Sequence, residues 1–163
     1  MLRPLEEKDL DCVIDIVVES WRALYRGYVS PELFTEAGVW AQRLRLRADL
    51  TSRRLEESVW EEDGRVLGLL SVGDTADSDR PGAFEIWRVY LAPEARGRGI
   101  GGQLLAWAEA RARERGYGEA VIWAFRENVR ALAFYQKHGY RPDREEYLGE
   151  PYCAYGVRLV KAL

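Results

Sequence analysis

The sequence predicts an α/β fold in which a mixed central β-sheet is flanked by helices. Three observations predict it. Short apolar runs alternate along the chain with segments whose apolar residues recur at helical spacing. A strand-like segment ends in a glycine-rich turn that opens a helix, and an Asp-Gly pair joins two further strand-like segments. No linker, repeat or low-complexity segment divides the chain, so residues 1–163 are expected to form a single domain.

The first third of the chain predicts one short strand followed by helices. Residues 2–5 have a strand pattern, and residues 8–25 predict an amphipathic helix because apolar side chains recur every three or four positions. Gly27 ends this helix, and Pro31 is expected to begin a short second one. Residues 40–50 are again helical in pattern and rich in arginine.

A hairpin and a central strand are expected next. The Asp-Gly pair at 63–64 has the composition of a two-residue hairpin turn, and residues 57–62 and 66–72 would be its strands. Residues 74–82 are polar and predict a loop, which leads into a strand over residues 84–91.

Helix and strand then alternate to the end of the chain. The pattern predicts a helix over 100–115 that stops at residues 116–118, followed by a strand over 120–125. Asn128 is a good N-cap for the next helix, and Gly139 is placed to end that helix.

Two closing strands, residues 141–147 and 152–160, are expected to be joined by a turn at 149–151. They complete the predicted order β-α-α-β-β-β-α-β-α-β-β, which indicates a mixed sheet with helices around it.

The composition is that of a soluble protein with an ordinary core. Hydrophobic residues make up 47% of the chain, and the net charge of −3 gives no reason to expect nucleic acid or a membrane as partner. No signal peptide or membrane-spanning run is visible, so a cytoplasmic location is expected. Cys12, Cys153 and the single histidine show no metal-binding spacing, so neither a metal site nor a disulfide is predicted.

The turn between the central strand and the helix at 100–115 predicts an anion site. Its glycines allow several backbone N–H groups to converge, and the helix N-terminus adds roughly half a positive charge. Arg96 and Arg98 would strengthen this field, so a phosphate is the expected ligand.

Three known phosphate-binding patterns fit this turn unequally. A Walker loop is absent from the chain. Gly97, Gly99 and Gly102 match the dinucleotide fingerprint Gly-x-Gly-x-x-Gly, but no acidic residue lies where the ribose would need it. About 60 residues follow the turn, too few for the rest of a doubly wound domain.

The third pattern is Arg96-x-x-Gly99-x-Gly101, preceded by a strand that begins near Glu85. A second segment, Asn128-Val129-Arg130-Ala131-Leu132-Ala133-Phe134-Tyr135-Gln136-Lys137-His138-Gly139-Tyr140, follows it at a fitting separation. Together these segments resemble the GNAT superfamily of acyl-CoA N-acyltransferases. The resemblance covers residues 84–141 and implies the GNAT fold, with acetyl-CoA as co-substrate and no metal.

The resemblance also implies which residues would bind the coenzyme. Backbone groups of the central strand would pair with the pantetheine arm, and N–H groups of the turn would hold the pyrophosphate. These binding residues are Val89, Tyr90, Leu91, Arg96, Gly97, Arg98, Gly99, Ile100, Gly101 and Gly102, with Asn128 as both helix cap and coenzyme contact.

Two catalytic residues are implied in the same way. Glu85 stands where several family members have a general base, and the alternatives are an exposed strand charge or a water acting alone. Tyr135 stands where the family commonly has the tyrosine that protonates the departing thiolate; the alternative is a buried aromatic pair with Phe134. His138 is expected to interact with the helix end rather than to act as a base.

The acceptor site is expected between the first helices and the closing strands. Trp21, Tyr25, Tyr28, Glu85 and Tyr147 are the candidate substrate-binding residues. The neighbouring acids Glu145 and Glu146 would suit a cationic amine. Aromatic residues at helical spacing equally predict core packing.

The resemblance therefore implies an acetyl-CoA-dependent N-acetyltransferase that moves an acetyl group to a primary amine of a small molecule by direct attack in a ternary complex. The alternatives are a protein N-terminal or lysine acetyltransferase and a non-catalytic acyl-CoA-binding sensor. A nucleotide-binding oxidoreductase is disfavoured by length. The sequence leaves open the acceptor amine, the acyl chain and the oligomeric state, a homodimer included.

Overall fold

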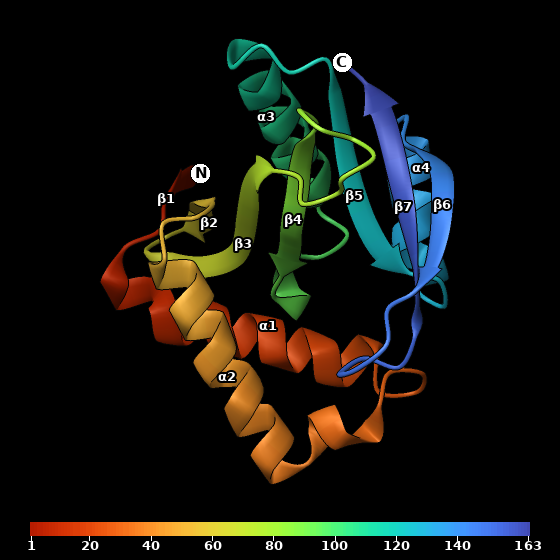
Figure 1. Ribbon diagram of the computed structural model, residues 1–163. Helices are drawn as coiled ribbons and strands as arrows, with labels where there is room; N and C mark the ends of the chain where they lie inside the picture. Colours follow the sequence, from red (N-terminus) through yellow and green to blue (C-terminus); the bar gives the residue numbers. More distant parts are fainter.

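A computed structural model describes residues 1–163 as a seven-stranded sheet with helices on both faces (Figure 1). The strand order is β1-β2-β3-β4-β5-β7-β6, and every neighbouring pair is antiparallel except β4 and β5. The predicted mixed sheet is therefore confirmed. The strands are β1 (Leu2–Pro4), β2 (Glu56–Glu62), β3 (Arg65–Asp74), β4 (Phe84–Leu91), β5 (Glu119–Phe125), β6 (Arg141–Tyr147) and β7 (Tyr155–Ala162).

Four helices cover the sheet in pairs. Helices α3 (Ile100–Glu114) and α4 (Val129–Lys137) lie behind the strands in Figure 1, and α1 (Leu10–Leu24) and α2 (Glu36–Thr51) cover the opposite face. Short 3₁₀ turns precede α1, α2 and α3, at Glu7–Asp9, Pro31–Phe34 and Pro93–Ala95. No helix is both long enough and apolar enough to cross a membrane.

Two element boundaries differ from the sequence prediction by three residues or more, and local contacts explain both. Helix α2 starts four residues earlier than expected because the Thr35 hydroxyl accepts a hydrogen bond from Gly38 N at 3.0 Å and caps it. The last strand starts at Tyr155 rather than Tyr152, because Cys153 has a φ of 50° and its N–H donates to Gly149 O. Such a left-handed residue interrupts an extended strand.

The core consists mainly of two apolar layers. Eighteen buried residues, including Phe84, Ile86 and Leu104, pack between the sheet and the pair α3 and α4. Nine others, including Val13, Val17 and Leu69, pack between the sheet and the pair α1 and α2. The sheet is thus held rigidly from both sides, which fixes the positions of its central strands.

The central strands β4 and β5 separate partway along their length. They pair through Phe84, Glu85 and Ile86 only, although β4 continues to Leu91. At the same place β4 has a bulge, since Ser71 pairs with Arg88 and Val72 with Ile86, which leaves Trp87 unmatched. A bulge bends a strand and increases its twist. The two strands therefore diverge and open the middle of the sheet.

Candidate active site

The opening between β4 and β5 contains a cavity of about 240 Å³. It is walled by α1 on one side of the sheet, by α4 on the other, and by the connection between β6 and β7. Of its sixteen lining residues, all but Asn128 and Gly156 are hydrophobic. The fourteen hydrophobic ones are Trp21, Tyr25, Ile86, Trp87, Val89, Tyr90, Ile122, Trp123, Ala124, Phe125, Ala131, Tyr135, Leu148 and Tyr152.

The turn between β4 and α3 presents unpaired hydrogen-bond donors. None of the backbone N–H groups from Gly97 to Gly102 donates to an acceptor within the protein, and Gln103 is the first whose N–H bonds back, to Gly99 O. Gly97 and Gly99 have φ values of 70° and 79°, which glycine adopts without strain. The first N–H groups of a helix have no partner inside it, so the turn is built to accept an anion.

The last two glycines of the turn have a packing role. A Cβ on Gly101 would lie 3.0 Å from the Phe134 ring, and one on Gly102 would lie 2.9 Å from His138 Nε2. These glycines therefore let α3 approach α4 closely. A side chain on Gly101 would therefore meet the Phe134 ring first. His138 accordingly packs at the end of α4, where its Nδ1 lies 2.8 Å from Phe134 O.

The two arginines of the turn are engaged elsewhere. Arg96 donates to Leu91 O at 3.0 Å and to Ser20 Oγ at 3.1 Å, so it ties the end of β4 to α1. The carbonyl of Leu91 is consequently occupied, whereas the resemblance implied that Leu91 would offer main-chain groups to pantetheine. Arg98 lies on the surface and pairs with Glu62 at 2.8 Å. The backbone, more than these side chains, supplies the donors of the turn.

Glu85 is buried, with 5% of its surface exposed, so the alternative of an exposed strand charge is wrong. Its Oε2 accepts a hydrogen bond from Thr75 Oγ1 at 2.7 Å. Burial raises the pKa of Glu85 to about 7, and the negative charge of Asp77 acts in the same direction. Glu85 is not among the residues that line the cavity, although its neighbours Ile86 and Trp87 are. A relay such as water would connect its carboxylate to the cavity.

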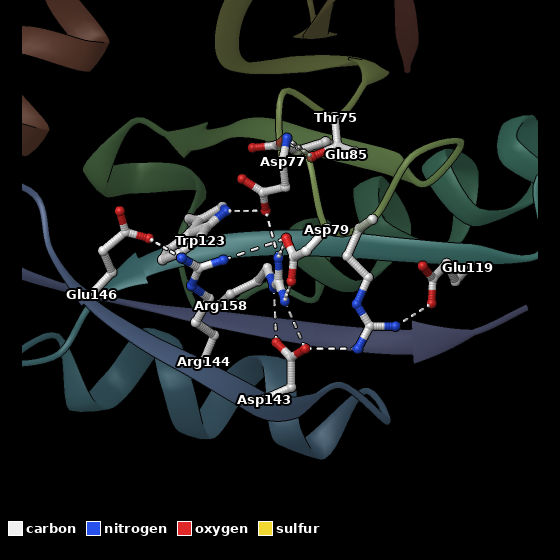
Figure 2. A network of polar contacts seen from close by, with 11 residues as sticks. Thr75, Asp77, Asp79, Glu85, Glu119, Trp123, Asp143, Arg144, Glu146 and Arg158 are labelled. Carbon is white, nitrogen blue, oxygen red and sulfur yellow. Dashed lines mark hydrogen bonds and ion pairs between the residues drawn. The ribbon is translucent and has the colours of Figure 1, made fainter.

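A charged network holds the loop over Glu85 in place (Figure 2). Arg158 on β7 is 2% exposed and donates to Asp77, Asp79 and Asp143 at distances from 2.8 to 3.1 Å. Asp77 also accepts from Trp123 Nε1 at 3.0 Å, and Trp123 lines the cavity. The network thus joins the loop that covers Glu85 to the wall of the cavity.

Tyr135 and Asn128 reach the cavity from α4 and its N-terminus. Tyr135 is 8% exposed, and burial raises its pKa well above the ordinary value, so the phenol stays protonated at neutral pH. Asn128 caps α4 by accepting a hydrogen bond from Ala131 N at 3.3 Å, and it also lines the cavity. Both residues predicted from α4 therefore lie in the cavity wall.

Aromatic side chains form the wall opposite α4. The Trp21 ring lies 5.0 Å from Tyr25, 5.7 Å from Phe125 and 5.6 Å from Tyr152. Trp21 Nε1 donates to the Tyr90 hydroxyl at 2.9 Å, which connects α1 to β4 across the cavity. Of the three aromatic residues expected at the acceptor site from the first helices, Trp21 and Tyr25 line the cavity, whereas Tyr28 packs against Tyr25 outside the lining.

The expected contributors from the closing strands lie away from the cavity. Tyr147 is 53% exposed and packs against Tyr155 on the sheet surface. Glu145 pairs with Arg126 at 2.7 Å, and Glu146 pairs with Arg144 at 3.3 Å. Arginine therefore neutralises both acids, and neither faces the cavity.

Several residues at or around the cavity were missed from the sequence. Trp87 and Trp123 line it because the bulge and the divergence of β4 and β5 turn them inward. Arg158 and Asp77 are 81 positions apart, so no local pattern could have paired them. An arginine in an otherwise apolar strand was the one available signal, because a buried charge requires a partner.

The sequence matches the family described as the acetyltransferase (GNAT) family over residues 14–140. The chain is 28% identical over 151 residues to the spermidine N(1)-acetyltransferase of Thermoplasma acidophilum, a match that covers 87% of this chain and 88% of the relative. It is 26% identical over 140 residues to the peptidyl-lysine N-acetyltransferase YiaC of Escherichia coli, with 86% and 82% covered.

Solved structures share the fold. A PaiA N-acetyltransferase from Thermoplasma acidophilum in complex with coenzyme A superposes with a TM-score of 0.75 at 22% identity and covers 100% of this chain and 98% of its own. A ribosomal-protein-alanine N-acetyltransferase from Brucella melitensis gives a TM-score of 0.74 at 22% identity, with 100% and 99% covered. Since the family match extends over most of the chain, this protein belongs to the GNAT family of acetyltransferases.

Proposed function

We propose that this protein transfers an acetyl group from acetyl-CoA to a primary amine of a small molecule, by direct attack in a ternary complex. The observation that carries the proposal is the combination of the cavity between β4 and β5 with the turn that follows β4, whose N–H groups are unpaired. That arrangement fits a ligand with an anionic pyrophosphate at one end and an apolar arm at the other.

The residues fit acetyl-CoA as follows. The N–H groups from Gly97 to Gly102 would bind the pyrophosphate, and the edge of β4 beyond Ile86 would pair with the pantetheine arm through Val89 and Tyr90. Acetyl-CoA supplies the activated acetyl thioester.

Two side chains would move the protons. Glu85, with a pKa near 7, accepts a proton from the attacking amine through water. Tyr135, protonated at neutral pH, donates a proton to the thiolate sulfur as the bond from carbon to sulfur breaks. The amine nitrogen gains the acetyl group and loses one proton, so the free thiol and the amide are the products.

The shape of the cavity favours a small acceptor over a protein. Aromatic side chains enclose it, and the acids that could have formed a peptide-binding groove, Glu145 and Glu146, are paired with arginines. The names of the relatives include both a polyamine and a peptidyl-lysine enzyme, so they do not decide between these classes.

The test is to incubate the protein and acetyl-CoA with a panel of amines, amino acids and peptides, and to measure free thiol and acetylated product. We expect N-acetylated small amines. Acetylation of peptides alone would support the protein-directed alternative. Tight binding of acetyl-CoA without transfer to any acceptor would support the sensor alternative.

A further inference from the structure

The cavity contains no charged side chain. Fourteen of the sixteen lining residues are hydrophobic, and the other two are Asn128 and Gly156. The side-chain polar atoms available to a ligand there belong to tyrosine hydroxyls and the Asn128 amide, because the three tryptophan indoles of the lining already donate their hydrogen bonds within the protein. An acceptor bound in the part of the cavity that the pantetheine arm leaves free, beside Trp21, Tyr25 and Tyr152, thus meets neutral side chains only.

The carboxylates around the cavity are committed to partners, with one exception. Asp77 pairs with Arg158 at 3.1 Å, and Glu127 pairs with Arg126 at 3.4 Å, as Glu145 also does. Among the buried carboxylates of the protein, Glu85 alone has no ion-pair partner, and its hydrogen bond comes from the neutral Thr75. The protein interior therefore offers one unpaired carboxylate, which can compensate at most one buried ammonium group.

A second ammonium group would be unfavourable in this cavity. Removing an ion from water without a partner is unfavourable, whereas burying an apolar group is favourable. A chain of methylene groups or an aromatic ring on the acceptor thus favours binding in the cavity, and an additional charge disfavours it.

From this lining we infer that the acceptor is a monoamine whose amino group is carried on an aromatic or aliphatic body, and that polyamines are poor acceptors. The inference rests on the proposed function and narrows its substrate class. The expected acceptor therefore differs from the polyamine in the name of the spermidine acetyltransferase, although the two chains match along most of their length.

A pair of matched amines tests the inference. Hexylamine and 1,6-diaminohexane have the same six-carbon chain and differ by one amino group, so their kcat/KM values isolate the second charge. With saturating acetyl-CoA we expect hexylamine to be preferred by at least about tenfold, the ratio that 1.4 kcal/mol produces. Equal values, or a preference for the diamine, would overturn the inference.

Two variants of equal charge sharpen the comparison. Leu148 lines the cavity, whereas Leu24 is an exposed residue of α1 outside it. Leu148→Glu should offer a partner for the second ammonium and reduce the preference for hexylamine by about tenfold. Leu24→Glu should leave the preference as in the wild type. A change of the ratio in both variants, or in neither, would contradict the argument from the lining.

Binding separates this inference from the proposed function. If no amine is acetylated, the proposed function fails, and calorimetric titration of both amines into the protein with CoA decides the inference alone. Tighter binding of hexylamine than of the diamine would sustain it. No binding of hexylamine, or tighter binding of the diamine, would overturn it.

Discussion

The two ends of strand β4 are built in opposite ways. At its beginning, around Glu85, the polar groups of the covering loop are nearly all satisfied, and Arg158 alone bonds three aspartates (Figure 2). Beyond its end, the turn from Gly97 to Gly102 leaves its N–H groups without acceptors. Polar groups that are hydrogen-bonded within the protein hold the loop in place, whereas free N–H donors are available to bind a ligand.

This difference assigns separate tasks to the two ends. The beginning of β4 positions a buried carboxylate and sets its pKa, since the loop that covers Glu85 is held by Arg158. The turn beyond the far end presents free N–H donors, which in the proposed function would bind the pyrophosphate. The cavity lies between them, so a ligand held at the turn extends toward the groups that would move protons.

A negative charge placed in the turn should have the largest effect of the variants, and it should act on acetyl-CoA binding. Gly99→Asp adds a carboxylate beside the free N–H groups and should weaken acetyl-CoA binding by at least about 10²-fold through repulsion of the pyrophosphate. Gly99→Asn is the matched control, because Asn has the same shape and both residues tolerate the left-handed conformation of this position. Titration calorimetry measures both. Equal losses in the two variants would show that backbone strain, not charge, is responsible.

The second largest effect is expected from removal of the Tyr135 hydroxyl. Tyr135→Phe keeps the ring that fills the cavity wall, so folding and acetyl-CoA binding should persist while kcat falls by about 10²-fold. An acyl donor with a more acidic thiol should partly restore the rate. Wild-type kcat, measured when chemistry limits turnover, would identify Tyr135 as a packing residue.

Neutralising the buried carboxylate tests the other end of the strand. Because the pKa of Glu85 is about 7, wild-type kcat/KM should rise as the pH climbs through 7, and Glu85→Gln should lack this rise and be slower by roughly 10- to 10²-fold at pH 8. A pH profile that is unchanged in Glu85→Gln would leave water as the only base.

The dependence of folding stability on pH provides a second test of the raised pKa of Glu85, and its direction can be predicted. The folded-state pKa of Glu85 lies above the ordinary value of 4.5, so the folded protein binds more protons between these two values. The wild type should therefore lose stability as the pH rises from about 4.5 to 7, and Glu85→Gln should lose less. Denaturation by urea across this range measures it, and parallel curves would contradict the raised pKa.

Breaking the charged network should affect stability first and catalysis second. Arg158→Met removes a buried arginine that bonds three aspartates and leaves Asp77 without a cationic partner, so it should lower the free energy of unfolding by roughly 2–4 kcal/mol. Arg47→Met, which removes an exposed pair with Asp11, should cost less than about 1 kcal/mol. A pH profile in Arg158→Met that still rises near 7 would show that the loop holds Glu85 without this arginine.

Local patterns predicted most of the fold. The Asn128 cap, the hairpin at 63–64 and the glycine turn each depend on residues within a few positions of one another, so their signals survive in a single sequence. The same is true of Tyr135, whose place on α4 follows from its distance to Asn128.

The features that could not be predicted from the sequence depend on contacts between residues that are far apart in the chain. The bulge at Trp87 arises from the register between β3 and β4, and the burial of Glu85 arises from a loop that Arg158 holds from β7. The expectation that Glu145 and Glu146 would serve an amine failed because their partners, Arg126 and Arg144, could not be read from spacing.

The central claim is that the amine attacks acetyl-CoA directly while both are held in the cavity. Initial rates measured with acetyl-CoA and amine varied together test this most directly. The account predicts intersecting double-reciprocal lines and no acetylated protein in mass spectra taken without amine. Parallel lines together with an acetylated protein would contradict it.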